Sequence, residues 1–207
     1  MPELTIEAIE SAPFAQLCYV AWLAGRNEAV VIDPGFDTRS VLRLIEQNRL
    51  RPEMILNTHG HVDHIAGNAA LKSAFPEAPL VIGRNESALL TDPEANMSAP
   101  FGLPVRSPEA DRLVGEGDEI EAAGIRFVVR EIPGHSPGSV VYIAEQFDPP
   151  IVFGGDFPLL KSGIRTKLFT LPDATRVYPG HGPATTIGAE RRSNPFVGDR
   201  AGSALLS

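Results

Sequence analysis

Three histidines and an aspartate are concentrated in one short segment, Thr58-His59-Gly60-His61-Val62-Asp63-His64. Imidazole and carboxylate groups are costly to bury without partners, so such a cluster either stays in solvent or binds a metal ion that offsets the loss of hydration. The segment follows an apolar run at residues 54–56 and precedes a helix-like pattern at residues 65–75, and Gly60 allows a sharp turn between them. The spacing therefore predicts a metal-binding loop between a strand and a helix.

Two further histidines, His135 and His181, complete the five that the chain contains. Each lies in a Pro- and Gly-rich loop that follows an apolar run, and Asp156 ends a Gly-Gly-Asp sequence after the apolar residues 151–153. A single histidine in such a loop is more often a surface residue, and Asp156 could simply cap a helix. Four strand ends that each offer a nitrogen or carboxylate ligand nevertheless indicate one shared site.

The elements that must position these loops follow from hydrophobic alternation and turn residues. Alternation predicts strands at residues 4–9, 17–23, 29–32, 79–82, 119–122, 125–132 and 139–144. An apolar stripe predicts a helix at residues 40–47, capped by Asp37 or Thr38. Weaker patterns predict helices at residues 85–90, capped by Asn85, and at residues 159–171.

The motif Thr-His-x-His-x-Asp-His is followed by Pro-Gly-His-Ser-Pro-Gly, Gly-Gly-Asp and Tyr-Pro-Gly-His-Gly. This series resembles the motifs of the metallo-β-lactamase superfamily, and in particular those of its glyoxalase II-like hydrolases. The resemblance extends from about residue 18 to residue 196 and implies a mixed α/β (α+β) fold, the four-layer αββα sandwich. No repeat or linker divides the sequence, so we expect residues 1–207 to form a single domain.

The resemblance also implies a pair of metal sites. It assigns one ion to His59, His61 and His135, the other to Asp63, His64 and His181, and both to Asp156. Nitrogen and oxygen ligands without cysteine suit two Zn²⁺ ions, with Fe or Mn as alternatives. Asp63 and His64 are also the candidate catalytic residues. Asp33 is expected beneath the metal loop as a partner for a histidine, although an aspartate in Asp-Pro-Gly could equally serve only the turn.

The sequence departs from the family pattern after Asp156. Relatives usually have several residues there, with an aromatic residue and a Gly-Arg-x-Asp element, whereas here Phe157-Pro158 leads directly into the predicted helix. Because relatives can carry a second Gly-Gly-Asp, Asp156 could correspond to either copy. We therefore expect a shortened segment in front of this helix.

Two other segments lack a regular pattern. Residues 92–108 are rich in Pro, Ala and Ser, and we expect a long surface loop there. This loop either forms a wall of the site or is held down by its apolar residues Met97, Phe101 and Leu103. From about residue 198 onward we expect a flexible tail.

A metal pair would lower the pKa of a bound water from about 15.7 to about 7, so that no serine or cysteine nucleophile is needed. The resemblance implies hydrolysis of thioesters such as S-lactoylglutathione, because a thiolate leaves with little help from an acid. One alternative is a mononuclear iron oxygenase similar to the persulfide dioxygenases, with His59, His135 and Asp156 as ligands. Another is a metal-binding protein whose catalysis is lost with the shortened segment. A lactonase or β-lactamase also fits the hydrolase interpretation.

Composition sets the remaining limits. A chain of 207 residues with 43% hydrophobic and 21% charged residues is typical of a globular protein, and its net charge of -8 argues against a general nucleic-acid surface. No basic leader or long apolar run is present, so we expect a cytoplasmic protein that does not bind membranes. Cys18, the single cysteine, lies in an apolar run and is expected in the core. The expected partner is a small-molecule thioester.

Overall fold

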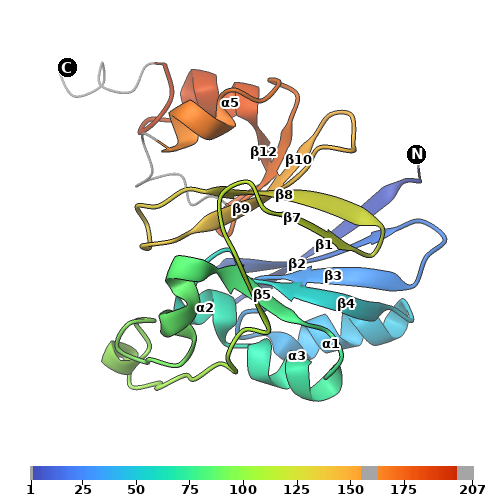
Figure 1. Ribbon diagram of the computed structural model, residues 1–207, viewed down its shortest axis with the longest axis vertical. Helices are drawn as coiled ribbons and strands as arrows, with labels where there is room; N and C mark the ends of the chain where they lie inside the picture. Colours follow the sequence, from blue (N-terminus) through green and yellow to red (C-terminus); the bar gives the residue numbers. More distant parts are fainter. Residues whose placement is uncertain (1, 155–162, 200–207) are drawn as a thin grey trace.

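Two β-sheets stacked face to face form the centre of the computed structural model, which describes residues 2–154 and 163–199 (Figure 1). Neighbouring strands of the first sheet follow chain order: β1 (Leu4–Ser11), β2 (Gln16–Leu23), β3 (Glu28–Ile32), β4 (Arg51–Leu56), β5 (Leu80–Gly83) and β6 (Arg112–Val114). Those of the second sheet do the same: β7 (Glu119–Ala122), β8 (Ile125–Glu131), β9 (Val140–Ala144), β10 (Ile151–Phe153), β11 (Arg176–Tyr178) and β12 (Thr185–Thr186).

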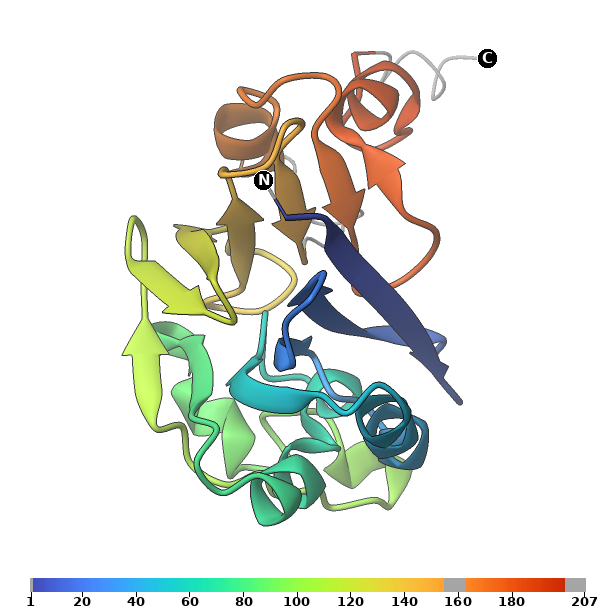
Figure 2. The same ribbon diagram turned by 90° about the vertical axis from the view of Figure 1, so that its right-hand side faces the viewer.

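Helices cover the outer faces of both sheets (Figures 1 and 2). The first sheet carries α1 (Thr38–Gln47) and α3 (Asn68–Ala74), with the short α2 (Val62–Ile65) beside them. The second carries the π-helical turn η3 (Ile164–Leu168) and α5 (Ile187–Ser193). Two 3-10 turns, η1 (Arg84–Leu90) and η2 (Ala99–Phe101), follow β5. The arrangement confirms the predicted four-layer αββα sandwich.

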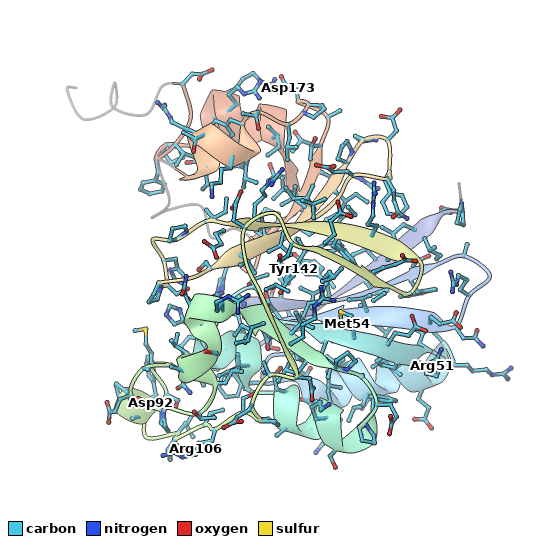
Figure 3. All side chains as sticks on the ribbon, viewed as in Figure 1. Arg51, Met54, Asp92, Arg106, Tyr142 and Asp173 are labelled. Atoms are coloured by element: carbon cyan, nitrogen blue, oxygen red, sulfur yellow. The ribbon has the colours of Figure 1, made fainter. Side chains whose placement is uncertain are left out.

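Period-two alternation along the strands explains why these layers form. In β2, Tyr19 packs between the two sheets, whereas Cys18 packs toward α1 and α3 with no exposed surface, as the sequence predicted. Met54 and Tyr142 lie between the sheets in Figure 3. A further apolar cluster that includes Ile187 joins the second sheet to its helices. Burial of each such large side chain contributes about 1.5–3 kcal/mol to stability before entropy is counted.

The strand ends that carry the histidine loops meet at one edge of the sandwich. Parallel pairing of β3 with β4 and of β4 with β5 places the segments after them side by side. Two main-chain hydrogen bonds join the sheets there, from Val140 N to Thr58 O at 2.8 Å and from Leu17 N to Gly180 O at 2.8 Å. The topology therefore brings distant loops together.

The predicted helix at residues 65–75 is wrong in its extent. The chain forms α2 and α3 instead, with a break at Gly67. Gly67 N donates to Pro34 O at 2.8 Å, and a Cβ at Gly67 would lie only 2.7 Å from Thr38 Oγ1. Close contact with the segment between β3 and α1 therefore interrupts the helix, which hydrophobic periodicity alone could not show.

The loop at residues 92–108 is held by buried polar groups. Met97, Phe101 and Leu103 expose 49%, 57% and 52% of their surface, although Phe101 still packs against Phe14. These three residues therefore contribute less to holding the loop than expected. Asn96 is fully buried instead, and its amide donates to Leu89 O and Val105 O at 3.0 Å each. Its main-chain oxygen accepts from Val62 N at 2.9 Å, which ties the loop to α2.

Other predictions differ in detail. Helix α1 is capped by Asp37 as expected and starts at Thr38, but η1 starts at Arg84 without the side-chain cap expected from Asn85. Strand β6 was not predicted, because it is only three residues long and has one buried side chain. The helix predicted at residues 159–171 is described only from residue 163, and there it is a π-helical turn that ends at Leu168, so the predicted end is wrong. Most of the predicted tail lies outside the described residues. Within the described ranges, no helix combines the length and the apolar character that crossing a membrane requires.

Candidate metal centre

His59, His61 and His135 form a first cluster at the edge where α2 follows β4 (Figure 1). One ring nitrogen from each lies within 4.8 Å of the others, and His61 Nδ1 is 3.0 Å from His135 Nε2. Two residues come from the segment after β4, and the third comes from the loop after β8, 74 positions away. Ligand atoms around a tetrahedral ion with bonds of 2.0–2.2 Å lie roughly 3.3–3.6 Å apart. The spacing therefore suits a divalent metal ion.

Asp63, His64 and His181 form a second cluster. His181 Nε2 lies 3.2 Å from Asp63 Oδ2 and 3.3 Å from His64 Nε2, and His64 Nε2 lies 3.8 Å from Asp63 Oδ2. The two clusters are neighbours, because the rings of His59 and His64 have centroids only 4.0 Å apart. The structure thus brings together six of the seven residues that were predicted as ligands. Their binding of metal stays a prediction.

His59 shows that the first cluster fits a cation. Its Nε2 is buried and has no hydrogen-bond partner among the described residues, an arrangement that costs free energy unless another group supplies the contact. Burial lowers the pKa of His59 well below its usual value, and the charges of the neighbouring histidines, His64 first, add to this effect. His59 is therefore neutral near pH 7, with a lone pair available to a metal ion.

Asp33 anchors the metal loop from below. Its two carboxylate oxygens accept from Thr58 N at 2.7 Å and from Thr58 Oγ1 at 2.6 Å, and Oδ2 also lies 3.0 Å from His64 Nδ1. A proton on Nδ1 of His64 leaves Nε2 facing Asp63 and His181 with its lone pair. Asp33 has φ of 51°, a left-handed conformation that aspartate tolerates better than most residues. The residue therefore does more than form a turn.

Asp63 and His181 lie at the more open side of the centre. The side chain of His181 is 36% exposed, and its Nδ1 lies 3.2 Å from the main-chain oxygen of Phe14. Burial raises the pKa of Asp63, but the hydrogen bond from His181 and the charges of His64 and His181 outweigh it, so the pKa lies below its usual value of 3.8. Asp63 is thus ionised at neutral pH and can bind a cation or accept a hydrogen bond from a water.

An aromatic group borders this open side. Phe14 packs edge-on against Phe101 at 5.4 Å between centroids and lies 6.1 Å from Phe36. The three rings come from the β1–β2 turn, the segment after β3 and the 92–108 loop. This apolar border meets the centre through Phe14, whose main-chain oxygen lies 3.2 Å from His181 Nδ1.

Sequence reasoning missed the polar groups beneath the metal loop. Asn57 donates to His64 O at 2.9 Å, and Asn68 donates to Asn57 Oδ1 at 2.8 Å. Tyr142, from the other sheet, donates to Asn57 O at 2.9 Å (Figure 3). Burial, with a smaller effect from Asp33, raises the pKa of Tyr142 well above its usual value, so its hydroxyl keeps its proton. An asparagine at a strand end was the only available sequence signal.

Asp156 was predicted as a ligand of both ions, but it lies within residues 155–162, outside the described residues. The same holds for the segment after it that is expected to be shortened. The structure therefore describes both three-residue clusters but not the carboxylate predicted to bridge them.

The sequence profile of the Metallo-beta-lactamase superfamily matches residues 12–192. The chain belongs to this superfamily. A relative within it, the hydroxyacylglutathione hydrolase GloC of Haemophilus influenzae, is 34% identical over 96% of this chain and 100% of its own. Superfamily membership places the chain among metallo-hydrolases and agrees with the gathering of histidine and aspartate ligands.

Two solved structures resemble the chain over almost its full length. The BLEG-1 B3 metallo-beta-lactamase has a TM-score of 0.86 and 33% identity, covering 93% of this chain and 99% of its own. The protein TTHA1623, in a di-iron-bound form, has a TM-score of 0.76 and 30% identity, covering 92% of this chain and 100% of its own. Both neighbours share the fold of this chain, but one is named as a B3 metallo-beta-lactamase and the other by its bound iron.

Proposed function

We propose that the protein is a metal-dependent hydrolase of thioesters, with hydroxyacylglutathione thioesters as the first class to examine. The observation that carries this proposal is the pair of adjacent ligand clusters, one of three histidines and one of Asp63 with two histidines. The rings of His59 and His64, one from each cluster, have centroids 4.0 Å apart. A full-length relative named as a hydroxyacylglutathione hydrolase supports the choice of substrate. Zinc is the metal that we propose, because the described ligands are nitrogens and oxygens.

Two divalent ions in these clusters would supply hydroxide near neutral pH and polarise a carbonyl oxygen. The chain's own residues prepare the site for this chemistry. Asp33 Oδ2 lies 3.0 Å from His64 Nδ1, which favours a proton on that nitrogen. Asp63 stays ionised, so it can orient an attacking water by accepting a hydrogen bond from it. His59 stays neutral because it is buried. No serine or cysteine nucleophile is required, and Cys18 is buried in the core.

A thioester suits this site for two reasons. A thiolate leaves readily, so the site needs no strong general acid beside the leaving group. The apolar border of Phe14, Phe36 and Phe101 offers a surface for the nonpolar part of a substrate next to His181. The first feature supports a thioester, and the second supports a substrate with a nonpolar part.

A substrate panel tests the proposal. The purified, zinc-loaded protein is assayed with S-lactoylglutathione, acyl thioesters of other thiols, a lactone and a β-lactam. We expect the highest kcat/KM with a thioester. If full metal occupancy gives no thioester hydrolysis, or if the β-lactam is hydrolysed fastest, the proposed function is wrong.

The second candidate is an iron-dependent oxygenase. The di-iron-bound form of TTHA1623, at 30% identity, supports iron as a metal for this fold, although the oxygenase alternative needs only one iron ion. In this alternative His59 and His135 would hold one iron, with Asp156 as the carboxylate. Iron-loaded protein that consumes oxygen in the presence of a persulfide, without hydrolysing thioesters, would favour the oxygenase.

A further inference from the structure

Glu86 is a buried carboxylate that joins two loops of the metal centre. It lies on η1 and has no exposed surface. Its Oε2 accepts from Gly60 N at 2.8 Å, and its Oε1 accepts from Gly138 N at 2.5 Å. Gly60 lies between His59 and His61, and Gly138 follows His135 by three positions. One side chain therefore contacts both segments that supply the first cluster.

Glycines make this contact possible. A Cβ at Gly60 would lie 2.4 Å from Leu89 Cβ, and a Cβ at Gly138 would lie 2.4 Å from Asn85 Cβ. A Cβ at Gly83 would lie 2.6 Å from Gly138 O. Any side chain at these three positions would push η1 away from the loops. The sequence therefore allows η1 to lie directly against both loops, where the Glu86 carboxylate can reach their main-chain N–H groups.

Each cluster has its own buried carboxylate. Asp33 contacts His64 of the second cluster and the main chain of Thr58, whereas Glu86 bonds the main chain on either side of the first cluster. Neither hydrogen bond of Glu86 involves a histidine ring. Glu86 therefore affects the metal site by holding the Gly60 loop and the Gly138 loop at a set distance from each other. The 3.0 Å separation of His61 Nδ1 and His135 Nε2 depends on that distance.

We propose that Glu86 is a positioning residue that sets the geometry of the first metal site, independently of the second. The proposal rests on the metal centre of the proposed function. A carboxylate is required because it offers one acceptor oxygen to each glycine N–H. Glutamine has the same shape but only one acceptor, so one N–H would face an amide NH₂ group. Aspartate is one methylene shorter and cannot reach both loops.

Cobalt titration of the metal-free protein tests the proposal without relying on turnover. Co²⁺ binding is followed by visible absorption in the wild type, in Glu86→Gln and in Asp33→Asn. His61→Ala and His64→Ala identify which binding step belongs to which cluster. We expect Glu86→Gln to weaken the first-cluster step roughly 10–100-fold, as loss of a partner behind metal ligands typically does. The second-cluster step should change less than about threefold. Asp33→Asn should weaken the second-cluster step, since Asp33 contacts His64.

Glu53→Gln is the matched control. Glu53 also accepts a main-chain N–H, from Ala123 at 2.8 Å, but it lies near the start of β4, whereas the metal loop follows the end of that strand. Figure 3 shows Arg51, at the start of β4, on the side opposite Asp92 of the 92–108 loop. This variant should leave both cobalt steps unchanged. Equal weakening of both steps by Glu86→Gln, or no weakening of either, would overturn the proposal.

Hydrogen exchange of the wild type gives a second test if Glu86→Gln does not fold. The amides of Gly60 and Gly138 should be protected in the metal-free protein, because Glu86 holds them before metal binds. Exchange as fast as that of an exposed loop would overturn the proposal. A wild type that binds two cobalt ions but hydrolyses no thioester would overturn the proposed function and leave this inference intact. A wild type that binds no cobalt would overturn both.

Discussion

Asp33 Oδ2 lies 3.0 Å from His64 Nδ1, and the same carboxylate holds the main chain of Thr58. A single residue at the end of β3 thus fixes both the orientation of a predicted metal ligand and the start of the loop that carries four of them. Because Asp33 is only 2% exposed, its three contacts are made with little competition from water.

Replacing Asp33 by Asn should therefore damage function more than folding. An asparagine amide has one acceptor oxygen, so it cannot replace both carboxylate oxygens, which face Thr58 and His64. The proton on His64 Nδ1 then loses the acceptor that favours it. We expect Asp33→Asn to lower kcat/KM for a thioester roughly 10–100-fold. Steady-state kinetics at saturating zinc measure this effect. Asp37→Asn, which changes the cap of α1, is the control and should retain activity, since asparagine also caps helices well.

His61 contributes to the first cluster from a partly exposed position, so its removal should spare the fold. We expect His61→Ala to reduce turnover by at least about 100-fold while the free energy of unfolding changes by less than about 1 kcal/mol. Kinetics and urea unfolding of the metal-free protein separate these effects. Retained turnover would show that the first cluster is not needed for the reaction.

The aromatic border beside His181 makes a prediction about substrate preference. Phe101 is 57% exposed yet packs against Phe14, so its removal takes away apolar surface without opening the core. We expect Phe101→Ala to raise KM roughly 3–10-fold for thioesters with long acyl chains, with little change for acetyl thioesters. Phe196→Ala is the control, since Phe196 is similarly exposed, at 47%, but follows α5. An equal effect of both variants would exclude a substrate contact at Phe101.

Cys18 gives the protein a defined sensitivity to alkaline pH. Burial raises the pKa of its thiol above the usual value of 9.0, and the charge of Asp33 adds to the increase. The unfolded chain releases this proton near pH 9 while the folded chain keeps it, so stability falls as pH rises above about 9, by about 1.4 kcal/mol per pH unit. Urea unfolding between pH 7 and pH 10 should show this decline, and Cys18→Ala should remove it. A flat profile for the wild type would contradict the burial of a neutral thiol.

The strands could be predicted from the sequence because apolar runs alternate with turn residues. The runs in front of the histidine loops are followed by Asn57, Pro133 and Pro179. That regularity placed His59, His135 and His181 on loops, and the family motifs gave their partners. The four layers were expected from the family resemblance, with which the order of strands and helices agrees. Local patterns were sufficient wherever a residue's role depends on its own neighbours in the chain.

Other features depend on contacts between distant segments, which no local pattern reports. The break at Gly67 comes from contact with Pro34, and Glu86 acts on glycines 26 and 52 positions away. Within its own segment Glu86 resembles a surface residue of a short helix. Its importance appears only once the two glycine loops are placed beside it.

The metal content of the purified protein tests the central claim most directly. Metal-free protein is reconstituted with excess zinc and freed of unbound metal. Its zinc content per chain is then measured by inductively coupled plasma mass spectrometry. Two clusters predict about two zinc ions per chain in the wild type and about one in both His61→Ala and His64→Ala. A wild type that retains no zinc, or the same metal content in all three proteins, would contradict the account.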